Sequence, residues 1–337
     1  HLFLISPMVK KQDDSLKILS HIFGLFTWFI GALIILIISK KQDEKEHSKN
    51  ALNWQISFTI YFFVLIILMI LSINSMGKFI AILGLCLGSF LNCFIYRLHA
   101  NKTIFGRSFC PDCKAKIAWY DNIPLGSFIW LRGKCRNCKR KISWQYPLIE
   151  LATAVLFVLV WQKYQVNIDI TDVTRYPLPV TGYLEIIRDW LFVCILIIIF
   201  IYDLRWQLIL DKITLPAMII AFGLNLWLGA NWLNLLLAAG AGGGFFLAQY
   251  LISRGSWIGG GDIRLGALMG LMLGWPQILV ALVLAYASGA IVGVGLVAAG
   301  KKKWSARIAF GTFLSAATIV VLLWGEEILE RYLDIII

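Results

Sequence analysis

Charged residues are scarce in this chain, and acidic residues are scarcer than basic ones. Asp, Glu, Lys and Arg make up only 15% of its 337 residues, whereas 59% are hydrophobic. A soluble globular domain has about 25% charged and about 45–50% apolar residues, so the composition excludes that class and predicts an all-α polytopic membrane protein. The net charge of +12 marks cytoplasmic loops in such a protein, and we therefore predict no nucleic-acid partner.

The sequence also lacks a glycine-rich turn between a strand and a helix, the usual site of a nucleotide-like cofactor. Its glycine run at 240–244 lies inside an apolar segment and follows no strand, so we interpret it as a surface for close helix packing. A transporter is expected to show internal repeats and polar residues at mid-membrane. Here the charges gather at one face, which disfavours that class.

Apolar runs long enough to cross a bilayer recur along the whole chain. A span needs roughly 20 apolar residues. One shorter apolar segment, 262–275, follows three glycines and is expected to be tilted or to enter the membrane late. The other expected spans are 20–39, 55–73, 77–98, 148–164, 188–203, 213–229, 233–252, 277–299 and 305–326.

Basic residues in the short loops set the orientation of these spans. The largest basic block lies within 101–147, and the positive-inside rule places it in the cytoplasm. Counting spans onward puts 165–187 outside, and Asp203 and Asp262 at the cytoplasmic ends of their helices. The aspartates were not used to set the topology, so this is an independent check. The block consists of Lys102, Arg107, Lys114, Lys116, Arg132, Lys134, Arg136, Lys139, Arg140 and Lys141.

The first 75 residues are predicted to be a separate membrane module with two spans around a charged hairpin. Ala51-Leu52-Asn53-Trp54-Gln55 opens the second span, in a pattern that resembles a small bacterial membrane family related to Tic20-type domains. A fusion near 72–76 is an alternative that the sequence leaves open. We expect four parts in all: 1–75, a first span of the main module at 76–100, a cytoplasmic four-cysteine domain at 101–147, and a multi-span core at 148–337.

Four of the seven cysteines form two C-x-x-C pairs, Cys110 with Cys113 and Cys135 with Cys138. Two such pairs can complete the tetrahedral shell of one Zn²⁺, and the Lys and Arg residues around them favour thiolates. Disulfides, which the cytoplasm disfavours, and free thiols are the alternatives. Because four thiolates leave no coordination position open, we predict a structural rather than a catalytic zinc.

Two aspartates near the ends of apolar runs most strongly indicate chemistry. Asp262 follows Gly259–Gly261, and Asp203 closes the run 191–202. A charge near bilayer depth costs about 2.5–3.5 kcal/mol, so each is a functional candidate. Two Asp residues that share one proton can activate water and polarise a carbonyl, which is aspartic protease chemistry. The alternatives are a helix cap at Asp262 and an ion pair of Asp203 with Arg205.

Five further motifs precede these aspartates, and in this order they are similar to the bacterial type IV prepilin peptidases over residues 77–325. Each motif alone is weakly specific, but their order and the two aspartates that follow make the resemblance specific. The motifs are Gly88-Ser89-Phe90-Leu91-Asn92 with Tyr96-Arg97, Cys110-Pro111-Asp112-Cys113, Trp119-Tyr120-Asp121-Asn122-Ile123-Pro124, Arg132-Gly133-Lys134-Cys135 and Tyr146-Pro147-Leu148-Ile149-Glu150.

The resemblance implies a GxGD-type peptidase core of about eight helices and a catalytic pair of Asp203 and Asp262. The substrates it implies are type IV prepilins and the pseudopilins of type II secretion. The implied enzyme cuts their leader after a glycine at the cytoplasmic face of the inner membrane and then methylates the new N-terminus with S-adenosylmethionine. The candidate cofactor-binding residues are Asp121, Asn122 and Glu150, and a helix macrodipole alone also explains Glu150.

Two departures from the family pattern and two other functions remain to be weighed. Asp211 is a second candidate partner for Asp262, but it lacks the preceding proline that is usual in the family. Arg264 stands where the family usually has Lys, so we carry over no role for it. A presenilin-type intramembrane protease is disfavoured by the four-cysteine loop. A non-enzymatic zinc-stabilised scaffold or transporter predicts that Asn at both aspartates is tolerated.

Overall fold

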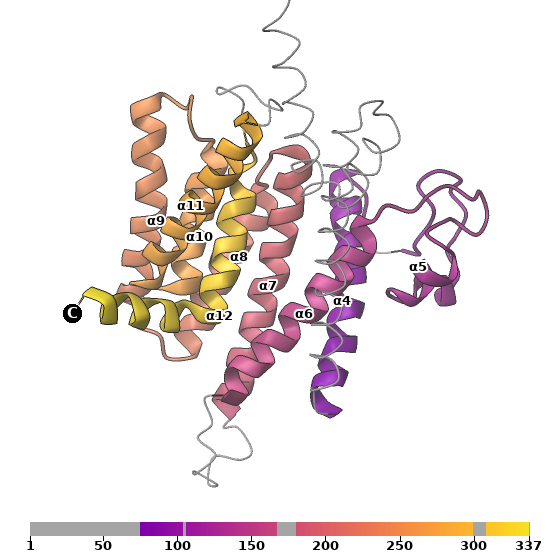
Figure 1. Ribbon diagram of the computed structural model, residues 1–337, viewed down its shortest axis with the longest axis horizontal. Coiled ribbons are helices and arrows are strands. Elements are labelled where there is room, and N and C mark those ends of the chain that lie inside the picture. The colour runs from indigo at the N-terminus through magenta and orange to yellow at the C-terminus, as the bar shows by residue number, and fades with distance from the viewer. Residues whose placement is uncertain (1–74, 104–105, 167–179, 299–307, 337) are drawn as a thin grey trace, which may run out of the picture. The chain divides into compact units, whose positions relative to one another are not determined.

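A computed structural model describes residues 75–103, 106–166, 180–298 and 308–336, and Figure 1 gives the arrangement of their helices. The expected spans at 20–39 and 55–73 lie outside the described residues. The chain divides into two compact units, and the larger one, residues 75–289 with 308–337, contains both the cysteine pairs and the aspartates.

Every long element in the described ranges is an α-helix, which confirms the predicted fold class. Five helices, α4, α6, α9, α11 and α12, are long and apolar enough to cross a membrane, so this is a multi-pass membrane protein. The short elements η1 (Trp119–Asn122) and α5 (Gly126–Trp130) lie between the first two of them. The long helices are α4 (Ser75–His99), α6 (Gln145–Val166), α7 (Val180–Trp206), α8 (Asp211–Trp227), α9 (Trp232–Ser253), α10 (Gly260–Leu273), α11 (Gln277–Ala298) and α12 (Phe310–Ile336).

The α4–α6 pair supports the four-cysteine domain and depends on glycine. A Cβ at Gly84 would lie 2.6 Å from the Cα of Ala154, and one at Gly88 would lie 2.7 Å from the Cα of Glu150. Only glycine therefore lets the two backbones approach this closely. The Asn92 amide then donates to the carbonyl oxygens of Gly88 (3.2 Å) and Tyr146 (3.1 Å), which fixes the start of α6 against α4.

The short helix α10 has only 14 residues, and it packs against α8, α9 and α12 (Figure 1). Its residues from Leu268 to Met272 are buried, so its length need not match the bilayer. In α9, a Cβ at Gly242 would collide with the carbonyl of Gly266, and one at Gly243 would lie 3.1 Å from the Cβ of Ala267. Close packing is confirmed for these two members of the 240–244 run, which let the backbone of α10 approach α9.

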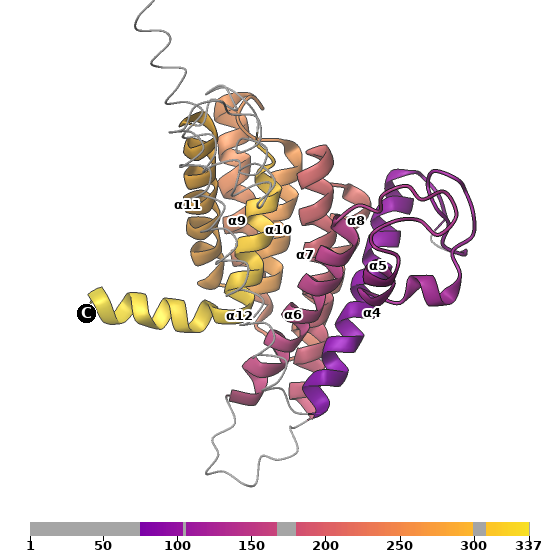
Figure 2. The same cartoon turned by 45° about the vertical axis from the view of Figure 1, so that its right-hand side comes forward.

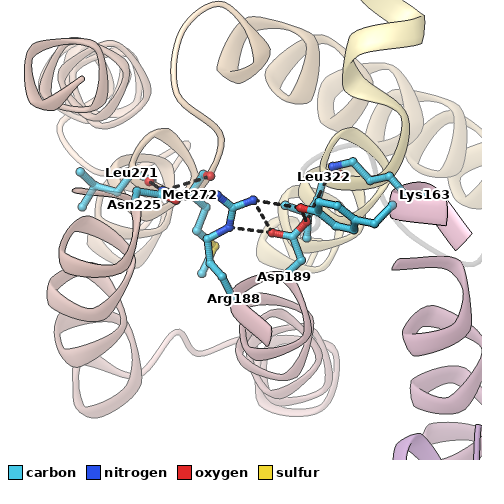
Figure 3. A network of polar contacts seen from close by, with 8 residues as sticks. Lys163, Arg188, Asp189, Asn225, Leu271, Met272 and Leu322 are labelled. Atoms are coloured by element: carbon cyan, nitrogen blue, oxygen red, sulfur yellow. Dashed lines mark hydrogen bonds and ion pairs between the residues drawn. The ribbon is translucent and has the colours of Figure 1, made fainter. Parts of the chain in front are cut away.

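The helix α7 begins at Val180, earlier than the predicted 188, because its charged residues are neutralised inside the bundle (Figure 3). Asp189 has no exposed surface, and its carboxylate forms an ion pair with the Arg188 guanidinium at 2.8 Å. It also accepts a hydrogen bond from the Tyr164 hydroxyl at 2.8 Å and lies 3.7 Å from the Lys163 ammonium. Arg188 reaches Asn225 of α8 at 3.2 Å. Arg188 and Asp189, which the sequence suggested as the edge of an apolar run, thus lie well inside a long helix.

The same polar network extends to two further helices. The Asn225 amide donates to the carbonyl oxygen of Leu271 in α10 at 2.6 Å, and the Lys163 ammonium donates to that of Leu322 in α12 at 2.8 Å. Five helices are therefore joined near the start of α7. Asp203 lies at the other end of the same helix, roughly 20 Å away at the usual rise per residue.

Candidate active site

The four cysteines of the two C-x-x-C pairs lie together. Their sulfur atoms are all within 4.8 Å of one another, and Cys110 and Cys138 are 3.9 Å apart. All seven cysteines are within the described residues, and all are free thiols. Four sulfur atoms in one cluster could hold a metal ion.

The two cysteine pairs sit on matching backbone turns. The N–H of Cys110 donates to Ala115 and that of Lys114 donates back to Cys110, both at 2.9 Å. In the second turn, the N–H of Cys135 donates to Arg140 at 2.8 Å and that of Lys139 donates to Cys135 at 3.0 Å. Lys114 and Lys139 both have positive φ values, of 60° and 58°. Each turn therefore presents its two thiols to one point.

The cysteines of the cluster differ in their readiness to ionise. A hydrogen bond from the backbone N–H of Ala115 lowers the pKa of Cys113 to about 7. The pKa of Cys138 is raised to about 11, because desolvation and its three neighbouring thiols outweigh a favourable hydrogen bond from the backbone at Arg140. The cluster therefore carries only part of its full thiolate charge at neutral pH until a cation binds.

Two ion pairs connect the first cysteine turn and η1 to the second turn. Arg136 donates to both carboxylate oxygens of Asp121, at 2.7 and 2.6 Å, and this hydrogen bonding holds the pKa of Asp121 below its ordinary value. Arg140 lies 2.7 Å from Asp112. Asp121 of the WYDN motif is thus tied to Arg136, the residue that directly follows the RGKC motif.

A cavity of about 750 Å³ lies between this domain and the helices α4, α6 and α7. The structure brings the three candidate cofactor residues, Asp121, Asn122 and Glu150, to its lining. Arg205, two positions after Asp203, also lines it. The volume lies within the range of about 300–1,000 Å³ that is usual for small-molecule pockets.

Glu150 attaches the domain to α6. Its carboxylate is buried and accepts a hydrogen bond from the backbone N–H of Leu125 at 2.8 Å, and it also bonds Ser89. Leu125 has a φ of 56°, a left-handed conformation that is costly for a branched residue. This contact explains Glu150 more specifically than the helix macrodipole does.

Asp203 is buried at the end of α7, where it meets the first turn of α12. The backbone N–H of Thr312 donates to its Oδ2 at 2.9 Å, and Gly311 supplies a second backbone hydrogen bond. A Cβ at Gly311 would lie 2.9 Å from the same oxygen, so glycine is needed for this approach. Within the described ranges, no ion pair joins Asp203 to Arg205, whose guanidinium lies over the Trp206 ring instead.

Asp262 is the third residue of α10. The residue before the helix, its N-cap, is Gly259, whose N–H donates to the Asp262 Oδ2 at 3.1 Å. The sequence left open that Asp262 is the N-cap of its helix. It is not the N-cap, but from the third position of the helix its side chain accepts a hydrogen bond from the N-cap residue. Only one of its carboxylate oxygens takes part in that contact.

A buried isoleucine brings the two aspartates to one place. A Cβ at Gly261 would lie 2.8 Å from the Ile209 Cβ, and one at Gly311 would lie 2.9 Å from the Ile209 Cδ1. Ile209 therefore packs between the residue before Asp262 and the residue that contacts the Asp203 carboxylate. Consistent with this, Asp203 is close enough to Asp262 to interact with it electrostatically. The site thus combines the α7–α8 loop with the starts of α10 and α12.

Asp211, the second candidate partner, has a different environment. It lies 2.6 Å from Arg264, and the two side chains are 52% and 37% exposed. Its charge is compensated by this cation, whereas the Asp203 carboxylate is held by backbone N–H groups. Arg264 therefore has a partner that the sequence did not indicate. Asp211 is an exposed member of an ion pair, whereas Asp203 is a buried carboxylate held by backbone N–H groups.

Sequence reasoning missed three residues of the aspartate site, namely Ile209, Gly311 and Thr312. Ile209 is far in the chain from Gly311 and Thr312, and all three act through apolar or backbone contacts rather than through a reactive side chain. The only available signal was the pair Phe310-Gly311, a glycine at the start of an apolar run on the side predicted to be cytoplasmic. Without the fold, a glycine at this position does not indicate a contact with a carboxylate.

Three family models match the chain. A model of the bacterial peptidase A24 N-terminal domain matches residues 82–164, and a model of the type IV leader peptidase family matches residues 190–294. A model of the magnetosome magnetite crystal formation protein family matches residues 12–110. The first two follow each other along the peptidase-like region, and the third covers most of the N-terminal module.

Three curated relatives of this chain carry the same name. The prepilin leader peptidase/N-methyltransferase of Aeromonas salmonicida strain A449 is 32% identical over 246 residues, which are 68% of this chain and 76% of the relative. The protein of that name from Klebsiella pneumoniae is 35% identical over 62% of this chain and 90% of its own length. The one from Bacillus subtilis strain 168 is 29% identical over 75% and 96%. No solved structure matches the chain.

Proposed function

The chain belongs to the prepilin leader peptidase/N-methyltransferase family, and from this premise we propose that it removes the leaders of prepilins and pseudopilins. Cleavage follows a glycine at the cytoplasmic face of the inner membrane. The basic block within 101–147 supports that orientation, because Lys and Arg mark cytoplasmic loops.

Asp203 and Asp262 are the proposed catalytic pair. The ionised member takes a proton from water as the water attacks the scissile carbonyl, and the protonated member donates a hydrogen bond to the carbonyl oxygen. The proton they share belongs to the pair rather than to one residue. The observation that carries this proposal is the packing of Ile209 against both Gly261 and Gly311, which brings together two aspartates from separate helices.

The surroundings of the two carboxylates suit this division of work. The backbone N–H groups of Gly311 and Thr312 fix the Asp203 carboxylate without supplying a competing positive charge. Asp262 keeps one carboxylate oxygen outside its helix-closing contact with Gly259. The exposed backbone of Gly259 and Gly260, which carries no side chains, gives an extended substrate strand room to approach.

The four-cysteine cluster is proposed to hold a structural Zn²⁺. Four sulfur atoms within 4.8 Å, on two matching turns, fit the tetrahedral all-thiolate shell that zinc favours. The bound ion would supply cross-linking of the two turns and charge compensation for the thiolates. Since the Asp112–Arg140 ion pair already links the same two turns, and the Asp121–Arg136 pair links η1 to the second, the metal and the ion pairs stabilise one arrangement.

Methylation of the new N-terminus is proposed to use S-adenosylmethionine in the cavity beside the domain. The family name supports the activity, and the lining of Asp121, Asn122 and Glu150 supports the place. Carboxylates there can hold the cationic parts of such a ligand, and Tyr120 offers a ring. Arg205 in the same lining puts this cavity next to the end of α7 that carries Asp203.

The two other functions are less well supported. A presenilin-like protease does not account for the four-cysteine domain or for the relatives' shared name. A non-enzymatic scaffold does not account for a glycine at 311 that makes room for a buried carboxylate.

The test is cleavage of a prepilin peptide with a Gly-Phe junction by the detergent-solubilised chain. Asp203→Asn and Asp262→Asn should abolish cleavage, whereas Asp211→Asn should retain it, because its ion pair with Arg264 is exposed and weak. Circular dichroism confirms that each variant folds. Cleavage at the wild-type rate by Asp203→Asn or Asp262→Asn would contradict the proposal. Methylation of a peptide that already begins at the new N-terminus should survive in both aspartate variants.

A further inference from the structure

The four-cysteine domain exposes large apolar side chains around α5. Trp130 is 81% exposed, Ile129 74%, Trp144 69% and Ile123 49%. We call these four residues the α5 surface. Domains that face water rarely gather such residues in one short segment without a partner.

The segments that carry the α5 surface are held together. The Ser127 backbone N–H and hydroxyl in α5 both donate to the Ile123 carbonyl oxygen, at 3.0 and 2.7 Å. At the other end, the Phe128 and Trp144 rings lie 5.0 Å apart. The connection between α5 and the start of α6 is thus made by aromatic contact.

The patch also continues onto a membrane-spanning helix. Leu148, one turn after Trp144, is 55% exposed, and its N–H donates to the Trp144 carbonyl oxygen at 3.2 Å. Leu148 belongs to α6, one of the helices long and apolar enough to cross a membrane. An exposed leucine in the first turns of that helix therefore follows directly on an exposed tryptophan of the α5 surface.

The depth of α5 relative to α6 is fixed by a hydrogen bond. Leu125, directly before α5, bonds Glu150, which is not at the end of α6 but more than one turn inside it. At the usual helical rise this lies roughly 7–8 Å below the start of the helix. Figures 1 and 2 show the corresponding arrangement, with α5 beside the upper part of α4 and not beyond its end.

We propose that the α5 surface inserts into the interfacial layer of the same bilayer that α4 and α6 span. Tryptophan is the side chain most typical of that layer, because its ring is apolar and its N–H is polar. The surrounding domain is rich in Lys and Arg, which anionic lipid headgroups attract. Insertion would fix the four-cysteine domain, and the cavity behind it, in a constant position relative to the end of α7 that carries Asp203.

The test is photolabelling in nanodiscs of phosphatidylcholine and phosphatidylglycerol that contain a lipid with a diazirine near its glycerol backbone. Trypsin releases residues 117–132 as one peptide, which holds Ile123, Ile129 and Trp130, and releases 108–114 from the cysteine turn of the same domain. Peptide 142–163 contains Trp144 of the α5 surface, so only its adducts from Leu148 onward, inside α6, report labelling of a span. We expect 117–132 to carry several-fold more lipid adduct than 108–114, with the adducts at 123–130.

Paired variants sharpen the result. Changing Ile129 and Trp130 to Asp should bring labelling of 117–132 down to that of 108–114 and leave 142–163 unchanged. Trp227→Asp makes the same change at a tryptophan that is 71% exposed at the end of α8, and should not affect 117–132.

Labelling of 117–132 in the wild-type chain does not depend on the folding of a variant, so it is the decisive test of insertion. A yield no higher than that of 108–114, with 142–163 well labelled, would overturn the proposal, whether the α5 surface faces water or is covered by protein. This outcome is independent of prepilin cleavage, so the proposed function stands or falls separately.

Discussion

Replacing Gly311 with alanine should impair catalysis while leaving substrate binding nearly intact. The new Cβ would lie 2.9 Å from the Asp203 Oδ2 and 2.9 Å from the Ile209 Cδ1. Ordinary contacts begin at 3.4 Å, so the carboxylate, the isoleucine or both must retreat by about half an ångström. The Asp203 side chain is the freer of the two to rotate, and its rotation would carry the carboxylate away from the pair.

The size of the effect follows from the precision that catalysis requires. A misplacement of about 1 Å can cost about 100-fold in rate, so half that shift should lower kcat about tenfold. This equals about 1.4 kcal/mol in the activation free energy. KM should change little, since Gly311 is buried and does not face the substrate.

The assay is steady-state cleavage of the prepilin peptide, with thermal unfolding measured in parallel. Gly325→Ala is a matched control in the same helix, because its Cβ would lie 2.8 Å from Val321 and far from the aspartates. It should lower stability without lowering kcat. Adding Ile209→Val to Gly311→Ala removes the methyl contact but not the carboxylate contact, so stability should recover and kcat should not. Full recovery of kcat in the double variant would refute the reasoning.

Three further predictions concern the rest of the molecule. Bound zinc should be released under acid conditions, because protons compete with the metal ion for the four thiolates; a zinc-indicator titration across pH measures this. Asn225→Ala should lower the free energy of unfolding by about 1–3 kcal/mol, since it leaves the buried Leu271 carbonyl without its donor, as denaturation in detergent can report. Asp121→Asn should destabilise by no more than about 1 kcal/mol, because Arg136 is half exposed. The lowered pKa of Asp121 means that this difference is present at neutral pH and disappears as acid protonates the wild-type carboxylate, which a comparison of melting temperatures across pH checks.

The sequence allowed the helices to be predicted because apolar runs are a local signal. It set the start of α7 too late, at 188, since Arg188 and Asp189 look like the end of a span when their partners are unknown. The cysteine cluster was equally accessible, because its spacing is local. The contacts of Ile209 and Gly311 were not, since they depend on how α7, α10 and α12 pack. The catalytic assignment of Asp203 and Asp262 remains a prediction from sequence that this packing supports.

The polar network at the start of α7 has a consequence for how the chain enters the bilayer. Asp189 and Arg188 sit in a segment that lipid alone would not accept, and two of their partners, Lys163 and Tyr164, belong to α6. Since α6 precedes α7 in synthesis, the neutralising groups are already present when α7 emerges. We therefore expect α6 and α7 to insert as one hairpin, and α8, α10 and α12 to join it afterwards.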